Sequence, residues 1–150
     1  MSFKEQFKKE REAHIRSANH VLRLAAVEAV NYAITSAAVG NPDLWASKYH
    51  PKGYVGGTFR SSLFLTKTKP SVRVPTEIRP AGSIIQEYTS RIMSEYSDKW
   101  ILASNIPYAK PLDNGHSKQM PNGLTAPTAL HVNSKIPELT RIANQKYGIS

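Results

Sequence analysis

The sequence places its strongest constraints on the chain path in one stretch, NIPYAKPLDNGHSKQMPNG, residues 105–123. The stretch holds three prolines, three asparagines and two glycines. Proline fixes φ and removes an amide donor, and an Asn-Gly pair favours a turn with positive φ. An apolar run, residues 100–103, precedes it, and a helical pattern follows it. We therefore expect a shaped loop with one defined path, of the kind that often carries function or contacts.

Upstream of this loop, apolar residues recur at helical spacing in two segments. The first segment, residues 3–38, predicts one long helix that ends at Gly40-Asn41-Pro42. Its expected stripe comprises Ala18, Val21, Leu22, Ala25, Ala29, Tyr32, Ala33 and Ser36. The second segment, residues 82–97, predicts a helix whose N-cap Ser83 forms a capping box with Gln86. Its expected stripe comprises Ile84, Ile85, Tyr88, Ile92 and Tyr96.

Downstream of the loop, two prolines are placed where helices begin. Proline is favoured at the first helical position, so Pro127 predicts a short helical turn over residues 128–132. Pro137 likewise predicts a final helix over residues 136–147. We expect this final helix to bury Leu139, Ile142 and Ala143.

Strand patterns lie between the helices. Residues 63–67 and 99–104 predict two strands, and Val72 and Val74 alternate with polar neighbours to predict another. Residues 43–54 predict an irregular connection. This order indicates an α+β fold, a small, mostly antiparallel sheet packed by a long N-terminal helix, a middle helix and a C-terminal helix. We expect a single domain, residues 1–150, in which residues 1–16 project as a helical arm or fray and residues 17–150 form the core.

Composition narrows the classes of function. The net charge is +9 and the sequence pI about 9.9, which favours contact with polyanions. The chain has no cysteine, which excludes disulfides, thiolate nucleophiles and cysteine-based zinc sites. The N-terminus lacks the pattern of a signal peptide, and no apolar run approaches the length of a membrane span. We expect synthesis in the cytoplasm and no membrane contact.

Motifs for catalysis or cofactors are weak throughout. Asp113, His116 and Ser117 suggest a hydrolase triad, but such groups usually come from distant segments, and a polar turn is the preferred interpretation of their adjacency. No pair of histidines has metal-ligand spacing. The glycines and hydroxyls of residues 56–62 do not have the spacing of a phosphate-binding loop, and a tight turn is expected there. We expect a protein without enzymatic activity, metal or cofactor.

Residues 105–123 resemble a signature of the neck, or tail-completion, proteins of long-tailed bacteriophages. The family shows Asn-x-x-Pro-Tyr-Ala, then Leu-Glu-x-Gly, then Ser-x-Gln-x-Pro-x-Gly at similar spacing after a strand. The matching positions here are Asn105, Pro107, Tyr108, Ala109, Leu112, Asp113, Gly115, Ser117, Gln119, Pro121 and Gly123. A weaker upstream match, Thr-Gly-x-Leu-Arg-x-Ser in the family, has its counterpart in Gly57, Arg60 and Ser62. Asp113 and Phe59 depart from the usual Glu and Leu.

The resemblance implies a structural virion protein at the head–tail junction. Such subunits form a ring, here expected to be a hexamer, between the head-completion proteins and the tail terminator or tube, with genomic DNA passing through the lumen. The loop residues would then form the interface, where Tyr108 serves either as a partner anchor or as a core tyrosine that holds the loop to its own sheet. The alternative function is a basic nucleic-acid-binding module. In either case the docking or DNA-facing basic residues would be Lys4, Lys8, Lys9, Arg11 and Arg16.

Overall fold

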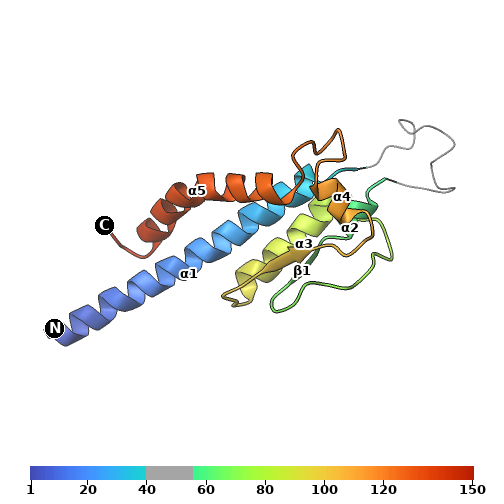
Figure 1. Cartoon of the computed structure of the whole chain (residues 1–150). Coiled ribbons are helices and arrows are strands. Elements are labelled where there is room, and N and C mark those ends of the chain that lie inside the picture. Colours follow the sequence, from blue (N-terminus) through green and yellow to red (C-terminus); the bar gives the residue numbers. More distant parts are fainter. Residues whose placement is uncertain (40–55) are drawn as a thin grey trace, which may run out of the picture.

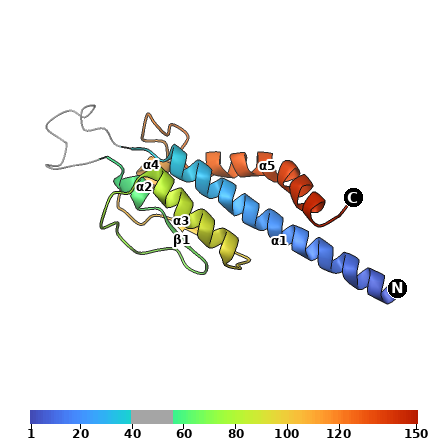
Figure 2. The same cartoon turned by 180° about the vertical axis from the view of Figure 1, so that it is seen from behind.

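Helix α1 (Phe3–Ser36) is the axis of the molecule, and helices α5 (Thr125–Lys146) and α3 (Ala81–Ser94) pack along different sides of it (Figures 1 and 2). The computed structural model describes residues 1–39 and 56–150. The predicted helix stop at residues 40–42 and the predicted connection at residues 43–54 lie outside the described residues. Three long helices and a small antiparallel sheet make the fold α+β, as predicted.

The sheet is antiparallel and consists of β1 (Phe64–Thr66) and β2 (Ile101–Ala103) in the described residues. The register places Leu65 opposite Leu102 at the centre of the pair. Leu65 is buried, and Leu102 packs against the same core, so these two side chains share the inward face of the sheet. Two further short helices complete the order, α2 (Thr58–Ser61) before β1 and α4 (Ala109–Asp113) after β2.

The core joins the middle of the molecule to the loop after β2. Helix α1 contributes Val30, Ala33 and Ile34, and α3 contributes Ile84, Tyr88 and Ile92, at the three- and four-residue steps of buried helix faces. From residues 105–123 and the position after them, Ile106, Met120 and Leu124 enter the same cluster. The loop therefore contributes buried side chains to the core and does not merely pass over its surface.

The predicted strand at residues 71–74 is wrong for the chain as described. Val72 and Val74 are 83% and 66% exposed, and no strand forms there. The neighbouring edge of β1 has no room for a further ladder, because the Tyr88 hydroxyl donates to the Leu63 carbonyl at 2.8 Å and Arg91 Nη1 donates to the Leu65 carbonyl at 2.9 Å. Side chains of α3 thus occupy the acceptors that a third strand would use.

The predicted helix boundaries also need correction. Helix α3 begins at Ala81 after Pro80, without a side-chain cap from Ser83, and Tyr96 lies beyond its end, 64% exposed. The N-terminal stripe is shifted as well, since α1 contacts two helices and buries Ser17, His20, Val30, Ala33 and Ile34, whereas Ala18 and Leu22 are exposed. Helix α1 ends at Ser36 rather than residue 38.

Helix α5 is continuous where two helices were predicted. Pro137 lies inside it, although proline lacks the amide that would bond to the carbonyl of Asn133. Asn133 is exposed, so water can satisfy that carbonyl, and packing against α1 favours the unbroken helix. Leu139 and Ala143 are buried as predicted, whereas Ile142 is 38% exposed.

The N-terminal part of α1 extends beyond the other elements (Figures 1 and 2). Its first turn carries a capping box, in which Ser2 Oγ accepts from the Glu5 amide at 3.2 Å and Glu5 Oε2 accepts from the Ser2 amide at 2.8 Å. Residues 1–11 are exposed, and the Ser17 hydroxyl, which donates to Asn144 Oδ1 at 2.7 Å, is the first buried position of α1. Residues 1–16 are called the arm below.

Candidate assembly site

The two sequence blocks that carry the resemblance meet at the C-terminal end of α1. The Ser62 and Ser104 hydroxyls share a hydrogen bond of 2.6 Å, which ties the upstream block to the start of the loop. Arg60 Nη2 donates to the Ala37 carbonyl at 3.4 Å. Segments distant in sequence are thus fixed to each other and to α1.

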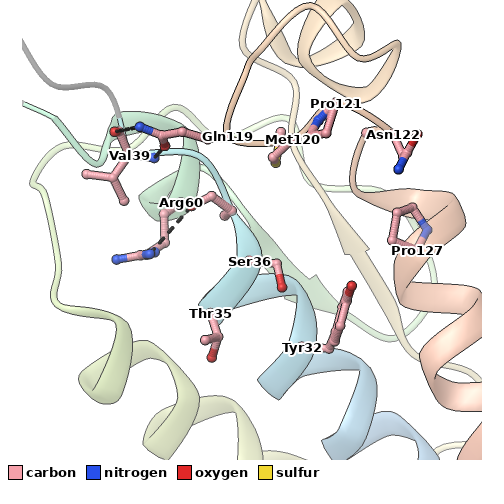
Figure 3. Close-up of a pocket in the computed structure, with 12 residues that line it drawn as sticks. Tyr32, Thr35, Ser36, Val39, Arg60, Gln119, Met120, Pro121, Asn122 and Pro127 are labelled. Atoms are coloured by element: carbon pink, nitrogen blue, oxygen red, sulfur yellow. Dashed lines mark hydrogen bonds between the residues drawn. The ribbon is translucent and has the colours of Figure 1, made fainter. Parts of the chain in front are cut away.

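Gln119 fastens the loop to the chain that leaves α1. Its Oε1 accepts from the Val39 amide at 2.8 Å, and its Nε2 donates to the Val39 carbonyl at 3.0 Å (Figure 3). The next residue, Met120, is buried, and its sulfur lies 3.3 Å from the Ala38 amide. A side-chain amide satisfies a donor and an acceptor of one residue at once, so Gln119 acts as an internal clamp.

Asp113 caps helix α5 from outside that helix. Its Oδ1 accepts from the amides of Leu124 and Thr125 at 2.8 and 2.7 Å, and its Oδ2 accepts from the Thr125 hydroxyl at 2.8 Å. The first amides of a helix lack intrahelical acceptors, and a carboxylate there also interacts favourably with the helix dipole. Burial acts to raise the pKa of Asp113, but the hydrogen bonds from Thr125 and Leu124 together hold it below its ordinary value. Asp113, which stands where the resembled signature has the longer Glu, thus reaches all three donors at the start of α5.

Two glycines of the loop permit contacts that no other residue would allow. Gly123 has φ +76°, and a Cβ there would lie 1.9 Å from the Asp113 carbonyl oxygen. Gly115 has φ +87°, and a Cβ there would lie 2.4 Å from the Pro121 carbonyl oxygen. Positive φ and backbone approach at both positions show that the loop is folded against itself.

The rest of the loop makes a compact turn with a partly exposed rim. Helix α4 lies within it and includes Pro111, which sequence reasoning assigned to irregular loop. An isolated bridge joins Ser117 to Met120, and the Ser117 hydroxyl accepts from the Gln119 amide at 3.2 Å. Tyr108 is 40% exposed, which argues against a core tyrosine. The other exposed signature positions are Asn105, Pro107, Gln119 and Pro121, whereas Ala109, Leu112, Gly115 and Ser117 are half-buried.

A polar hollow lies between the loop and the end of α1 (Figure 3). Its volume is about 510 Å³, and Tyr32, Thr35, Arg60 and Asn122 are among its lining residues. Arg60 Nε is buried without a hydrogen-bond partner in the part of the chain that the structure describes. Gly57, with φ +103°, forms the start of the one-turn helix that carries Arg60. The hollow therefore presents hydroxyl and amide groups and the Arg60 guanidinium.

The suggested hydrolase groups do not form a triad in this geometry. Both Asp113 oxygens bind the start of α5, and the Ser117 hydroxyl accepts from the loop backbone. Within residues 1–39 and 56–150, no hydrogen bond links His116 to either of them. The same residues contain no group of three or more metal-ligating side chains and no helix long and apolar enough to cross a membrane.

The basic residues predicted for docking lie apart from the loop. Lys4, Lys8, Lys9, Arg11 and Arg16 are all exposed on the arm. Phe3 and Phe7 stack there at a centroid distance of 6.3 Å and are 84% and 60% exposed. The arm and the loop are therefore two separate candidate contact surfaces.

The sequence patterns did not predict the buried residues that anchor the loop to the core. Ile106, Met120 and Leu124 are buried core members, yet single apolar residues between turn residues carry no periodicity that marks them. Ser104 was assigned to a strand end without a partner, and Ser62 is its partner. No family model, curated protein or solved structure matches the chain.

Proposed function

We propose that this protein is a structural subunit of a tailed-phage virion, a neck or tail-completion protein that forms a ring at the head–tail junction. The observation that carries the proposal is the spacing of the eleven signature positions in residues 105–123. The geometry supports it, because these positions build a loop whose shape is set by two positive-φ glycines, the Asp113 cap and the Gln119 clamp. A preshaped loop loses little entropy on docking.

In this proposal the loop has an inner and an outer part. Asp113, Gln119 and the glycines hold its shape, whereas Tyr108 and the exposed prolines meet the neighbouring protein. Tyrosine presents a large amphipathic surface with few rotatable bonds and is enriched at binding hot spots. The partners are further copies of the chain, the head-completion proteins and the tail terminator or tube. DNA passes non-specifically through the ring, whose basic subunits suit contact with phosphates.

The experiment that tests the proposal examines virions of the phage that encodes the chain. Mass spectrometry of purified particles should find the protein, and an amber mutation in its gene should yield unjoined heads and tails in electron micrographs. Normal joined particles from the amber mutant, or virions without the protein, would contradict the proposal.

A matched set of loop variants locates the interface. Tyr108→Ala should lower the yield of joined particles, because it removes an exposed anchor. Gly115→Val should also lower it by deforming the loop, since a Cβ there meets a backbone oxygen at 2.4 Å. Lys118→Ala, at an exposed position of the same loop, is the control and should leave the yield unchanged. Equal infectivity of all three variants would remove the loop from the interface.

The second candidate function, nucleic-acid binding, rests on the arm. Lys4, Lys8 and Arg11 are exposed and spaced so that they share one face of α1. If they contact phosphates, replacing all three with Ala should reduce the slope of log affinity against log salt for duplex DNA by up to about 3. Weak duplex binding at physiological salt by the unaltered protein would exclude this function.

A further inference from the structure

Within residues 1–39 and 56–150, strand β2 pairs with β1 on one edge only. On the opposite side of the sheet, the Leu63 and Leu65 carbonyls accept from Tyr88 and Arg91, so these carbonyls point away from β2. Residues opposite each other in an antiparallel pair alternate between bonded and non-bonded pairs. Leu102, the partner of Leu65, therefore points its own amide and carbonyl away from β1.

Leu102 also lines a groove of about 700 Å³. Its lining includes Leu102 and Ala103 of β2, Ala33 of α1, and Ala129 and Val132 of α5. In the described part of the chain, no ladder other than that of β1 reaches β2. An apolar groove beside a free strand edge has the form that accepts an added strand, since backbone bonds provide affinity and the groove receives alternate side chains.

The chain contains a strand-forming segment that its own sheet does not use. Ser71, Val72, Arg73 and Val74 alternate polar and apolar residues, and both valines are exposed. Pro70 and Pro75 flank the segment and limit an added ladder to about the length of β2. The same segment lines a hollow beside β1, on the side of the sheet away from the groove.

We propose that residues 71–74 of one copy add to β2 of a second copy as the third strand of its sheet. Leu102 lies on the inward face, so the residue that pairs with it must be apolar, which Val72 or Val74 satisfies. The other valine also faces α1, and Arg73 faces solvent opposite Ile101 or Ala103. The exposed valines of one copy thereby cover the apolar groove of the next.

This contact is heterologous, because the donated segment and the accepting edge lie on different sides of the subunit. Contacts of this kind join copies head to tail and close into a ring when the rotation allows. The inference rests on the proposed function in that it specifies which surfaces join neighbouring subunits. The contact itself needs only a second copy of the chain.

Cysteine cross-linking tests the contact directly, because the full chain has no cysteine of its own. Arg73→Cys and Ala103→Cys are prepared as separate full-length chains with different tags and mixed under mild oxidation, with Ile101→Cys as the reporter of the other register. A disulfide requires Cα atoms within about 7 Å. We expect a 73–103 or 73–101 disulfide-linked heterodimer several-fold above a mixture of Arg73→Cys with Ser83→Cys, an exposed position of α3.

A second variant separates the contact from effects on folding. Val72→Glu with Val74→Glu changes exposed side chains, so the melting temperature should stay unchanged while the cross-link to β2 is lost. Heterodimer at the level of the Ser83 control overturns the inference. A chain that carries both Arg73→Cys and Ala103→Cys gives a further test. If this variant forms the disulfide only within single chains at every dilution, the segment pairs with its own sheet and the inference is overturned.

The outcomes also distinguish this inference from the proposed function. If the protein assembles and is found in virions but the cross-link is absent, the strand contact is wrong and the proposed function stands. If the cross-link forms and virions lack the protein, the strand contact stands and the proposed function is wrong.

Discussion

Replacing Asp113 with Ala removes three hydrogen bonds from the start of α5. The Leu124 and Thr125 amides and the Thr125 hydroxyl lose their acceptor. Leu124 is 7% exposed, so its amide has little access to water, whereas Thr125 is exposed and can be solvated. Removal of a helix N-cap side chain costs about 0.5–2 kcal/mol. Because one donor stays buried here, we place Asp113→Ala at the upper end, about 2 kcal/mol of unfolding free energy.

Thermal unfolding measures this loss, and Asp113→Asn is the matched control. In a chain of this size, about 2 kcal/mol corresponds to a melting temperature lowered by roughly 4–8 °C. Asn keeps one oxygen to accept from the two amides, but it replaces the oxygen that accepts from the Thr125 hydroxyl with an amide donor. It also loses the charge, whose interaction with the helix dipole amounts to about 0.3–1 kcal/mol. Asp113→Asn should therefore lose less stability than Asp113→Ala, because the two backbone amides keep their acceptor.

The pH dependence gives a second check on the same residue. The pKa of Asp113 is lowered in the folded state, so its ionised form adds stability above the unfolded pKa of about 3.9, and this stability is lost as pH falls through the folded value. The difference between the unaltered protein and Asp113→Asn should shrink below about pH 4. Equal melting temperatures for the unaltered protein and Asp113→Ala at neutral pH would refute the capping role.

Three further predictions concern other contacts of the fold. Gly123→Ala should destabilise by more than about 3 kcal/mol in denaturant unfolding, whereas Gly82→Ala, with open space around it, should be neutral or slightly stabilising; similar effects would contradict the tight turn. Gln119→Ala should cost about 1 kcal/mol and raise amide exchange at the end of α1, and Lys118→Ala should do neither. Burial, followed by the charges of Lys146 and Arg23, lowers the pKa of His20, so the free energy of unfolding should fall as pH drops below about 6.5. His20→Gln should remove this pH dependence, and an unchanged pH profile in that variant would refute the role of His20.

Sequence patterns predicted the elements that form a face by themselves. The long N-terminal helix and the buried positions Ile84, Tyr88 and Ile92 follow from helical periodicity, because each helix must bury its own apolar side. The paired strands β1 and β2 also lie within their predicted ranges. The alternation at residues 71–74 predicted a strand that the described chain lacks, because strand formation needs an available partner edge and α3 occupies the one beside it.

The candidate site shows the same division. Prolines and glycines in residues 105–123 indicated a shaped loop, and the structure gives it that character through Gly115 and Gly123. The partners of its polar side chains could not be predicted, since Gln119 bonds a residue 80 positions away and Asp113 caps a helix eleven residues later. Sequence spacing identifies residue types but carries no information on which distant backbone groups need an acceptor or a donor.

Local sequence patterns indicated an α+β chain with a long, partly unburied basic helix and a stiff loop, because periodicity and backbone restriction are local properties. Three features are seen only in the folded chain: the loop forms part of the core, α5 runs through Pro137, and in the described residues β2 pairs with β1 alone beside an apolar groove. These features depend on contacts between segments far apart in the chain. Long-range packing selects among conformations that local sequence leaves nearly equal in free energy.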